Sequence, residues 1–255
     1  MENGSSNITE LNKKYTLKVS VIMPAYNLEN IIQKSVEKVA NMLNALNMNY
    51  EIIIVDDGSS DNTYRKALEI TSENVKVLRN KINMGKGYSV KKGIKASHGE
   101  YVLMLDADME IEIKNIKNII DLLSFNDIVI ASKRHPMAEY KAPLIRKILS
   151  VGYNNLVKLL TGVNISDTQT GLKAFKGEKI RYIIEYVTVK RYVFDVEILA
   201  IAKLLNLKVV EIPAYIIQGK LFSLRGTFRM FLDTLGIAYR LRIVKWYQKN
   251  LGLIK

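Results

Sequence analysis

The segment Tyr50-Glu-Ile-Ile-Ile-Val55 runs directly into Asp56-Asp57-Gly58-Ser59-Ser60-Asp61. A short β-branched run that closes on acids, glycine and serines predicts a buried strand ending in a polar loop. The same pattern returns at Lys18-Val-Ser-Val-Ile-Met-Pro24 and at Tyr101-Val-Leu-Met-Leu105, which is followed by Asp106-Ala-Asp108. Stretches with helical periodicity separate these runs, so strands and helices are expected to alternate.

The predicted elements continue this alternation along the chain. We expect strands at 18–24, 50–55, 75–78, 101–105 and 127–131, and helices at 29–46, 61–72, 87–96 and 112–124. Beyond residue 140 we expect helices at 144–160, 195–206 and 227–247, a strand at 208–212, and loops at 167–171 and 213–226. This order is typical of an α/β fold whose mostly parallel sheet is covered by helices on both faces. Ligands bind at the carboxyl ends of such strands, where the acids lie.

Composition narrows the class of protein. The 255 residues are 48% apolar and 25% charged, as in globular proteins, and no cysteine is present to form disulfides or thiolate sites. With only His98 and His135, a zinc site built from several histidines is not expected. The longest uncharged run, Val39–Tyr50, is shorter than the roughly 20 residues of a membrane-spanning helix. The polar N-terminus lacks a signal-peptide pattern, so a cytoplasmic location is expected.

The net charge of +13 is unevenly distributed. Residues 1–143 carry 19 Lys and Arg against 18 Asp and Glu, whereas residues 144–255 carry 19 against 7. The second half is therefore expected to face nucleic acid, a phosphorylated substrate or a lipid surface. Nucleic-acid binding predicts basic residues interleaved with aromatics and no acid-rich pocket, so the acids at the strand ends argue against it.

Asp106 and Asp108 form a D-x-D pair directly after a predicted strand. Two carboxylates at this spacing can converge on one divalent cation, and Glu110 could supply a further oxygen. Such a cation would be Mg²⁺ or Mn²⁺ bound to a diphosphate. The alternative is an ordinary solvated turn at the end of a strand.

Two further turns have both a structural and a functional interpretation. Ser60 and Asp61 are good helix N-caps, but two adjacent acids at 56–57 repel each other, and a nucleoside would give one of them a partner. Asn83-Met-Gly-Lys-Gly87 before a helix resembles a phosphate-cradling turn, although it lacks the P-loop spacing. Lys86 is a candidate contact for a diphosphate; a plain turn with a helix start is the alternative.

Five motifs occur in the chain in the following order: Val21-Ile-Met-Pro-Ala-Tyr-Asn27, Val55-Asp-Asp-Gly-Ser-Ser-Asp61, Asn83-Met-Gly-Lys-Gly87, Leu105-Asp-Ala-Asp108 and Asp167-Thr-Gln-Thr-Gly-Leu-Lys173. Together, over residues 18–235, they resemble a family 2 glycosyltransferase of the dolichyl-phosphate (polyprenyl-phosphate) mannosyl- and glucosyltransferase type. The resemblance implies the nucleotide-sugar-binding A-type glycosyltransferase fold.

The resemblance also implies a donor site. The residues expected to bind the nucleotide sugar are Pro24, Ala25, Tyr26, Val55, Asp57, Lys86, Asp106, Ala107, Asp108, Gln169 and Lys220. The implied metal ligands are Asp106, Asp108 and Glu110. The family's acidic residue after Tyr-Asn is Leu28 here, and Glu29 stands one place late, which weakens a carboxylate contact at that point.

On the acceptor side, the resemblance implies that Arg134, Arg146 and Ser150 grip a lipid phosphate. Arginine presents a fixed fork suited to phosphate oxygens, and Arg146 and Ser150, four residues apart, share one helix face. The alternative is an amphipathic helix with a solvated basic side. Asp108, Arg134 and Arg146 are the expected catalytic residues.

The implied reaction is metal-dependent, inverting transfer of mannose or glucose from GDP-mannose or UDP-glucose to dolichyl or polyprenyl phosphate. We expect a flexible tail over 1–16, a catalytic domain over 17–226 and amphipathic helices over 227–255. The last of these would lie on the cytoplasmic face of an anionic membrane, with Trp246 and Tyr247 at headgroup level; packed core helices are the alternative. A soluble family 2 enzyme with a sugar or polysaccharide acceptor, and a non-catalytic membrane scaffold, are the competing functions.

Overall fold

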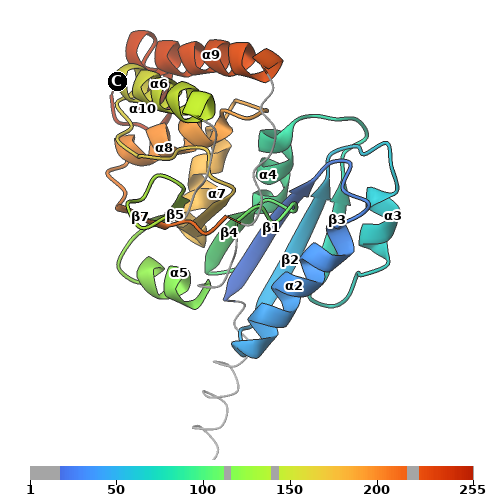
Figure 1. The fold of residues 1–255 in the computed structure, drawn as a ribbon. Coiled ribbons are helices and arrows are strands. Elements are labelled where there is room, and N and C mark those ends of the chain that lie inside the picture. The colour runs from blue at the N-terminus through green and yellow to red at the C-terminus, as the bar shows by residue number, and fades with distance from the viewer. Residues whose placement is uncertain (1–17, 112–115, 139–143, 217–223, 255) are drawn as a thin grey trace, which may run out of the picture.

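The strands form one central sheet. The computed structural model describes residues 18–111, 116–138, 144–216 and 224–254. Within them the strand order is β3-β2-β1-β4-β6-β5-β7, and neighbours are parallel except β6, which is antiparallel to β4 and β5. The strands are β1 (Val19–Ala25), β2 (Tyr50–Asp56), β3 (Val75–Arg79), β4 (Tyr101–Leu105), β5 (Ile128–Ser132), β6 (Leu172–Lys176) and β7 (Val209–Pro213). The mostly parallel α/β sheet is confirmed (Figure 1).

Helices cover both faces of this sheet. They are α2 (Ile32–Ala45), α3 (Thr63–Leu68), α4 (Lys86–Lys95), α5 (Ile116–Leu123), α6 (Leu144–Thr161), α7 (Gly177–Glu185), α8 (Phe194–Leu204), α9 (Leu224–Ala238) and α10 (Trp246–Asn250), with a π-helical turn, η1 (Tyr239–Ile243), before α10. Side chains in α6 and α9 are described from Ser150 and Phe228 onward. The helix predicted at 112–124 begins in 112–115, outside the described residues, and α3 is shorter than the predicted 61–72.

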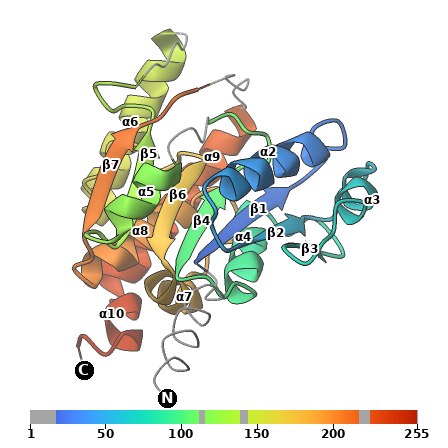
Figure 2. The same ribbon diagram turned by 90° about the horizontal axis from the view of Figure 1, so that it is seen from below.

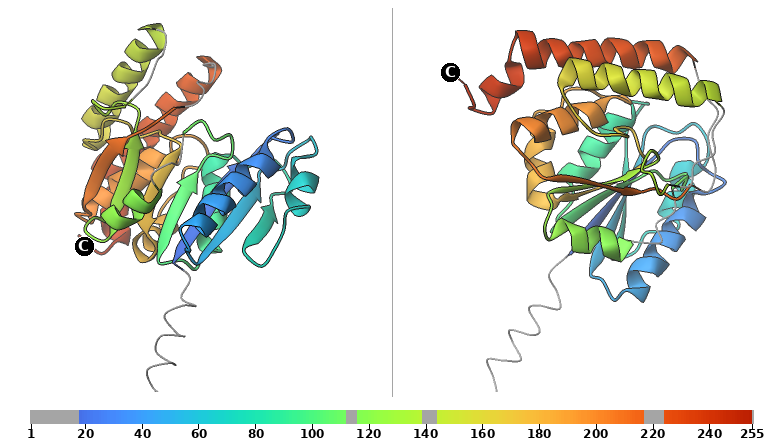
Figure 3. Two further views of the ribbon diagram at one scale, coloured as in Figure 1. Left: turned by 60° about the horizontal axis from the view of Figure 1, so that its bottom comes forward. Right: turned by 60° about the vertical axis from the view of Figure 1, so that its left-hand side comes forward.

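Alternate residues of the strands pack into two separate hydrophobic cores, one on each face of the sheet. In β1, Val21 and Met23 pack with α2 and α5, while Ile22 packs with α4, α7 and α8 on the opposite face. This is the two-residue period of a strand buried on both sides. Figure 2 shows the order of the strands from below, and the right-hand view in Figure 3 shows α6 and α9 side by side outside α8.

The sequence did not predict β6 or α7. Leu172-Lys-Ala-Phe-Lys176 does not read as a buried strand because a lysine stands second, yet Lys173 is 1% exposed. Its ammonium group is paired inside the protein with Asp195. A tertiary partner thus places a charged side chain where local pattern predicts an apolar one.

The C-terminal helix predicted at 227–247 is interrupted. The π-helical η1 follows α9, and Lys245 adopts a left-handed conformation with φ of 52° before α10 begins. The expectation that Tyr247 lies at headgroup level is wrong, because its side chain is fully buried and bonded to Glu197, and Trp246 packs against the same core. None of the described helices has the length and apolar character needed to span a bilayer.

Candidate active site

A cavity of about 670 Å³ opens at the carboxyl ends of β1, β2 and β4. We call it the strand-end cavity. Ten of the residues chosen from the sequence line it: Pro24, Ala25, Tyr26, Asp57, Lys86, Asp106, Ala107, Asp108, Glu110 and Gln169. Val55, a residue of β2, does not line the cavity, because its side chain is fully buried in the hydrophobic core. Residues far apart in the chain therefore meet at one edge of the sheet, as expected for a doubly covered parallel sheet.

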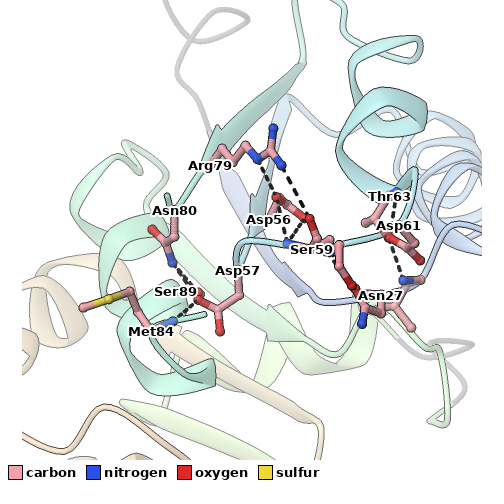
Figure 4. Close-up of polar contacts among 12 residues, drawn as sticks. Asn27, Asp56, Asp57, Ser59, Asp61, Thr63, Arg79, Asn80, Met84 and Ser89 are labelled. Atoms are coloured by element: carbon pink, nitrogen blue, oxygen red, sulfur yellow. Dashed lines mark hydrogen bonds and ion pairs between the residues drawn. The ribbon is translucent and has the colours of Figure 1, made fainter. Parts of the chain in front are cut away.

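The adjacent acids after β2 each have a different internal partner. Asp56 is fully buried and lies 3.2 Å from Nε of Arg79. Asp57 accepts hydrogen bonds at Oδ1 from Asn80 Nδ2 and Met84 N, and at Oδ2 from Gly85 N (Figure 4). The repulsion expected between the two acids is thus relieved within the protein, and Asp57 anchors the turn that precedes α4.

Gly85 fits this turn because of its conformation and its neighbours. Its φ is 99°, and a Cβ at this position would stand 2.6 Å from the carbonyl oxygen of Lys190. A side chain is therefore excluded on both grounds. The turn places Lys86 as the first residue of α4, where it lines the strand-end cavity.

The loops after β1 and β2 are joined by reciprocal hydrogen bonds. Asn27 N donates to Ser59 Oγ, and Ser60 N donates to Asn27 Oδ1 (Figure 4). Asp61 accepts from the backbone N of Glu29, and Glu29 in turn accepts from Asn62 N at 3.0 Å. The carboxylate of Glu29 therefore ties loops together, while Leu28 lines the cavity.

Lys86 and Asp106 form an ion pair in the strand-end cavity, with 2.6 Å between Lys86 Nζ and Asp106 Oδ1. Burial disfavours the Lys86 ammonium, but the carboxylates of Asp106, Asp195 and Asp108 outweigh it and raise the pKa of Lys86. The cation therefore stays charged throughout the physiological range. The backbone of Asp106 is held as well, because its N donates a hydrogen bond to Gly171 O at 3.0 Å.

A second, deeper ion pair lies behind the D-x-D segment. Lys173 Nζ is 2.7 Å from Asp195 Oδ1 and donates to the Thr170 carbonyl at 2.8 Å. Burial raises the pKa of the Asp195 carboxyl, although Lys173 and Lys86 oppose it. Asp195 lies in the first turn of α8, near the predicted helix start, but it also holds Lys173. Lys173 in turn fixes the loop that contacts Asp106.

The oxygens of Asp108 and Glu110 are of the hard kind that Mg²⁺ and Mn²⁺ prefer. Asp108 Oδ1 accepts from Glu110 N at 3.2 Å, and Glu110 Oε1 lies 3.3 Å from Lys133 Nζ without accepting a hydrogen bond. This buried oxygen accepts no hydrogen bond but is ion-paired with Lys133, so a divalent cation would share it with that ammonium group. However, the described residues contain no group of three or more carboxylate or histidine ligands close enough to hold a metal. A cation held by Asp108 and Glu110 would take its remaining ligands from other oxygens, such as those of a bound diphosphate or water.

The acceptor residues are only partly described. The Arg134 guanidinium donates to both the hydroxyl and the carbonyl oxygen of Ser150, which joins the loop after β5 to α6. Arg134 does not line the strand-end cavity, but its neighbour Lys133 does. The side chain of Arg146 lies outside the described residues. So does all of Lys220, which was expected to bind the nucleotide sugar and not the acceptor.

Sequence reasoning missed Arg191 and Tyr192, which line the strand-end cavity from the loop between α7 and α8. The Lys190 carbonyl accepts from Tyr88 N at 3.0 Å and so holds this loop against α4. Gln169 Nε2 donates to the Tyr192 carbonyl on the same wall. The segment Lys190-Arg-Tyr192 carries no local signal for this position, which depends on contacts with distant elements.

Known proteins resemble this chain in sequence, and others resemble it in fold. The profile of Glycosyl transferase family 2 matches residues 20–183. A dolichyl-phosphate beta-glucosyltransferase from Dictyostelium discoideum is 34% identical over 252 residues, covering 91% of this chain and 77% of the relative. The protein of the same name from Homo sapiens is 32% identical, covering 91% and 78%.

Solved structures confirm the A-type glycosyltransferase fold. Glucosyl-3-phosphoglycerate synthase from Mycobacterium tuberculosis, in complex with Mn²⁺, UDP-glucose and phosphoglyceric acid, has a TM-score of 0.65 and 17% identity, covering 91% of this chain and 82% of that one. Mannosyl-3-phosphoglycerate synthase from Rubrobacter xylanophilus has a TM-score of 0.59 and 17% identity, covering 98% and 79%. At such identity the likeness concerns the fold alone. From its sequence matches, the chain belongs to glycosyltransferase family 2 and is a glycosyltransferase of the dolichyl-phosphate glucosyltransferase-like kind.

Proposed function

We propose that this enzyme transfers glucose from UDP-glucose to dolichyl phosphate or a related polyprenyl phosphate. The observation that carries the proposal is the strand-end cavity, in which the nucleoside-side residues, Lys86 and the D-x-D acids meet. The names of the relatives at 30–34% identity favour glucose over mannose as the sugar and dolichyl phosphate as the acceptor.

In this proposal the donor lies along the strand-end cavity. Pro24, Ala25 and Tyr26 border the nucleoside beside the turn that Asp57 anchors. Lys86 lies where the diphosphate would pass Asp106, so its ammonium stabilises the negative charge of the departing UDP. Asp108 and Glu110 would hold Mg²⁺ or Mn²⁺, which supplies Lewis-acid stabilisation of the same leaving group.

The acceptor needs no side-chain general base. A phosphate monoester has a second pKa of about 6, so at neutral pH its oxygen is already a nucleophile. That oxygen bonds to the anomeric carbon of glucose as the bond from this carbon to UDP breaks, and the configuration inverts. Arg134, Ser150 and Arg146 are proposed to hold the acceptor phosphate next to Lys133, whose side chain borders the strand-end cavity.

We propose that α9 and η1 bring the enzyme to a membrane surface on the cytoplasmic side. The side chains of Thr234, Ile237 and Leu241 are buried against the core. Other positions of this segment expose large apolar side chains: Phe228, Phe231, Leu232, Leu235, Tyr239 and Ile243. An amphipathic segment of this kind, in a strongly basic half of the chain, suits an anionic lipid interface.

A donor panel tests the proposed function. The full chain is incubated with a short polyprenyl phosphate, Mg²⁺ or Mn²⁺, and UDP-glucose, UDP-galactose or GDP-mannose, and the glycolipid is identified by mass. We expect glucosyl phosphate lipid from UDP-glucose and none without a phosphorylated acceptor. Product from GDP-mannose alone would overturn the choice of sugar, and transfer to a free sugar acceptor in place of the lipid would support a soluble family 2 enzyme instead.

A further inference from the structure

A second cavity, of about 450 Å³, lies beside the strand-end cavity. We call it the α9 cavity. One wall is a face of α9 and the start of η1, the second is the loop at 188–191, and the third is the turn at Asn83 and Met84. None of the residues assigned to the metal or the acceptor phosphate lines it. Its volume falls within the usual range of small-ligand pockets.

Four of the eleven residues that line the α9 cavity carry a positive charge. Lys190 and Arg191 come from the loop, and Arg229 and Arg240 come from α9 and η1. Asp233 is the one carboxylate among its lining residues. Within the described part of the chain, no salt bridge joins Lys190, Arg191 or Arg229 to an acid, whereas Arg240 is paired with Glu197.

The cations of the α9 cavity influence the pKa of Asp233. Burial raises it, and the guanidinium groups of Arg229, Arg240 and Arg191 act against burial without cancelling it. Three arginines from two walls of the cavity therefore act on this one acid. Asp233 balances one positive charge and Glu197 is paired with Arg240, so two of the four lining cations remain in excess.

The walls of the α9 cavity are fastened to the same buried group. Glu197 is fully buried and accepts from the backbone N of Thr188 and of Val189. It also lies 3.3 Å from an Arg240 nitrogen and accepts from the Tyr247 hydroxyl. The loop and the C-terminal turn are thus held together by one carboxylate, and the cavity is preformed, so little ordering is needed on binding.

We propose that the α9 cavity is a second anion site that binds a phosphate group, separate from the donor and acceptor sites. Arginine forks suit phosphate oxygens through paired charge-assisted hydrogen bonds. Because Arg191 and Asn83 line both cavities, an anion bound here touches the wall of the strand-end cavity. The site therefore adjoins the donor without belonging to it.

Two sources could supply this phosphate. One is a free phosphate-bearing compound; the other is the headgroup of an anionic phospholipid, since α9 exposes Phe228, Phe231 and Leu235. The recognition chemistry is the same for both. The two sources differ in whether the phosphate arrives in solution or on a bilayer.

Calorimetric titration of inorganic phosphate into the full chain tests the site. UDP and Mg²⁺ are present at saturation so that the strand-end cavity is occupied. The variant Lys190→Gln/Arg229→Gln removes two lining cations at exposed positions, and Lys208→Gln/Lys249→Gln removes the same charge elsewhere on the surface. We expect the first variant to bind phosphate about tenfold or more weakly, and the control to bind as the wild type does.

Vesicle sedimentation separates the two sources. If phosphatidylcholine vesicles bind better with added phosphatidic acid, and only Lys190→Gln/Arg229→Gln loses this gain, the phosphate belongs to a lipid. If the gain is equal in both variants while phosphate affinity differs, the ligand is a free compound. Unchanged phosphate affinity in Lys190→Gln/Arg229→Gln, or an equal loss in the control, overturns the proposal. Failure of UDP to bind would count against the proposed function and leave the phosphate comparison intact.

Discussion

The acids at the strand ends and the cations of the C-terminal half contrast in how they are paired. Asp56 is held by Arg79, Asp57 by the turn before α4, and Asp106 by Lys86. In the α9 cavity, by contrast, four cations line the walls with one carboxylate, and of these four Arg240 alone has a salt bridge within the described residues, to Glu197. Paired acids fix geometry, whereas surplus cations attract an anion from outside. In the two proposals, the first region therefore holds the donor, and the second attracts a negatively charged partner.

The largest effect is expected from a substitution among the acids at the strand ends. Asp108→Ala removes a cavity carboxylate, so turnover of UDP-glucose should fall by about a hundredfold or more, as when preorganised stabilisation of a leaving group is lost. Initial rates across a range of Mg²⁺ or Mn²⁺ concentrations measure it. Glu37→Gln, at an exposed position of α2, is the matched control. If the turnover of Asp108→Ala stayed within a few fold of the wild-type value, the proposed role of Asp108 in the reaction would be refuted.

The buried pair behind the D-x-D segment should matter for stability. Lys173→Met leaves Asp195 buried without its cation, which is expected to cost about 3–5 kcal/mol in the free energy of unfolding. In Lys173→Met/Asp195→Leu no charge remains in the pair, so stability should largely return. Urea unfolding measures both. If the single and double variants were equally unstable, the pairing of these charges would not be the reason.

The same double variant separates stability from catalysis. Asp195 helps to keep Lys86 charged, and Lys173 holds the Thr170 carbonyl beside the residue that contacts Asp106. We therefore expect kcat to stay low after stability recovers, while the affinity for UDP changes little. Full recovery of kcat would show that the pair supports the fold alone.

Much of the strand-end cavity follows from sequence because its residues stand directly after apolar runs. Pro24, Asp57 and Asp106 each follow or end a strand whose pattern is local, and parallel strands bring such ends to one edge. Local pattern and global fold agree there, so ten of the proposed residues meet in one cavity. The family resemblance supplied what each of them would bind.

The remaining features depend on contacts that no local pattern encodes. Strand β6 was not predicted because it contains Lys173, and the burial of Lys173 requires Asp195 from α8. Arg191 reaches the strand-end cavity because Tyr88 and Glu197 hold its loop. Tyr247 has the sequence context of an interfacial aromatic, yet a bond to Glu197 keeps it inside. In each case a buried ionic or polar partner from a distant element overrides the local preference.

On the cation side, Arg134→Gln should weaken use of the acceptor without disturbing the donor. The guanidinium that bonds Ser150 would no longer offer its fork to a phosphate, so KM for polyprenyl phosphate should rise about tenfold. The affinity for UDP, measured by calorimetry, should stay near the wild-type value. Lys158→Gln, exposed on the same helix as Ser150, is the control. If Arg134→Gln lost affinity for UDP by as much as it lost for polyprenyl phosphate, the proposed division between donor and acceptor residues would be wrong.

The smallest expected effect concerns pH and the loops on the acid side. Burial raises the pKa of Asp61, but hydrogen bonds from Thr63 and Glu29 outweigh it, and the pKa is lowered overall. A carboxyl with a lowered folded-state pKa stabilises the fold above its ordinary pKa of about 3.9 and loses that contribution as pH falls through the lower value. Asp61→Asn cannot titrate there. The stability gap between wild type and Asp61→Asn, from urea unfolding, should thus be largest near neutral pH and shrink below about pH 4. A gap that stays constant to pH 2.5 would mean that the charge of Asp61 does not hold these loops, and that the acid side relies on neutral hydrogen bonds at this point.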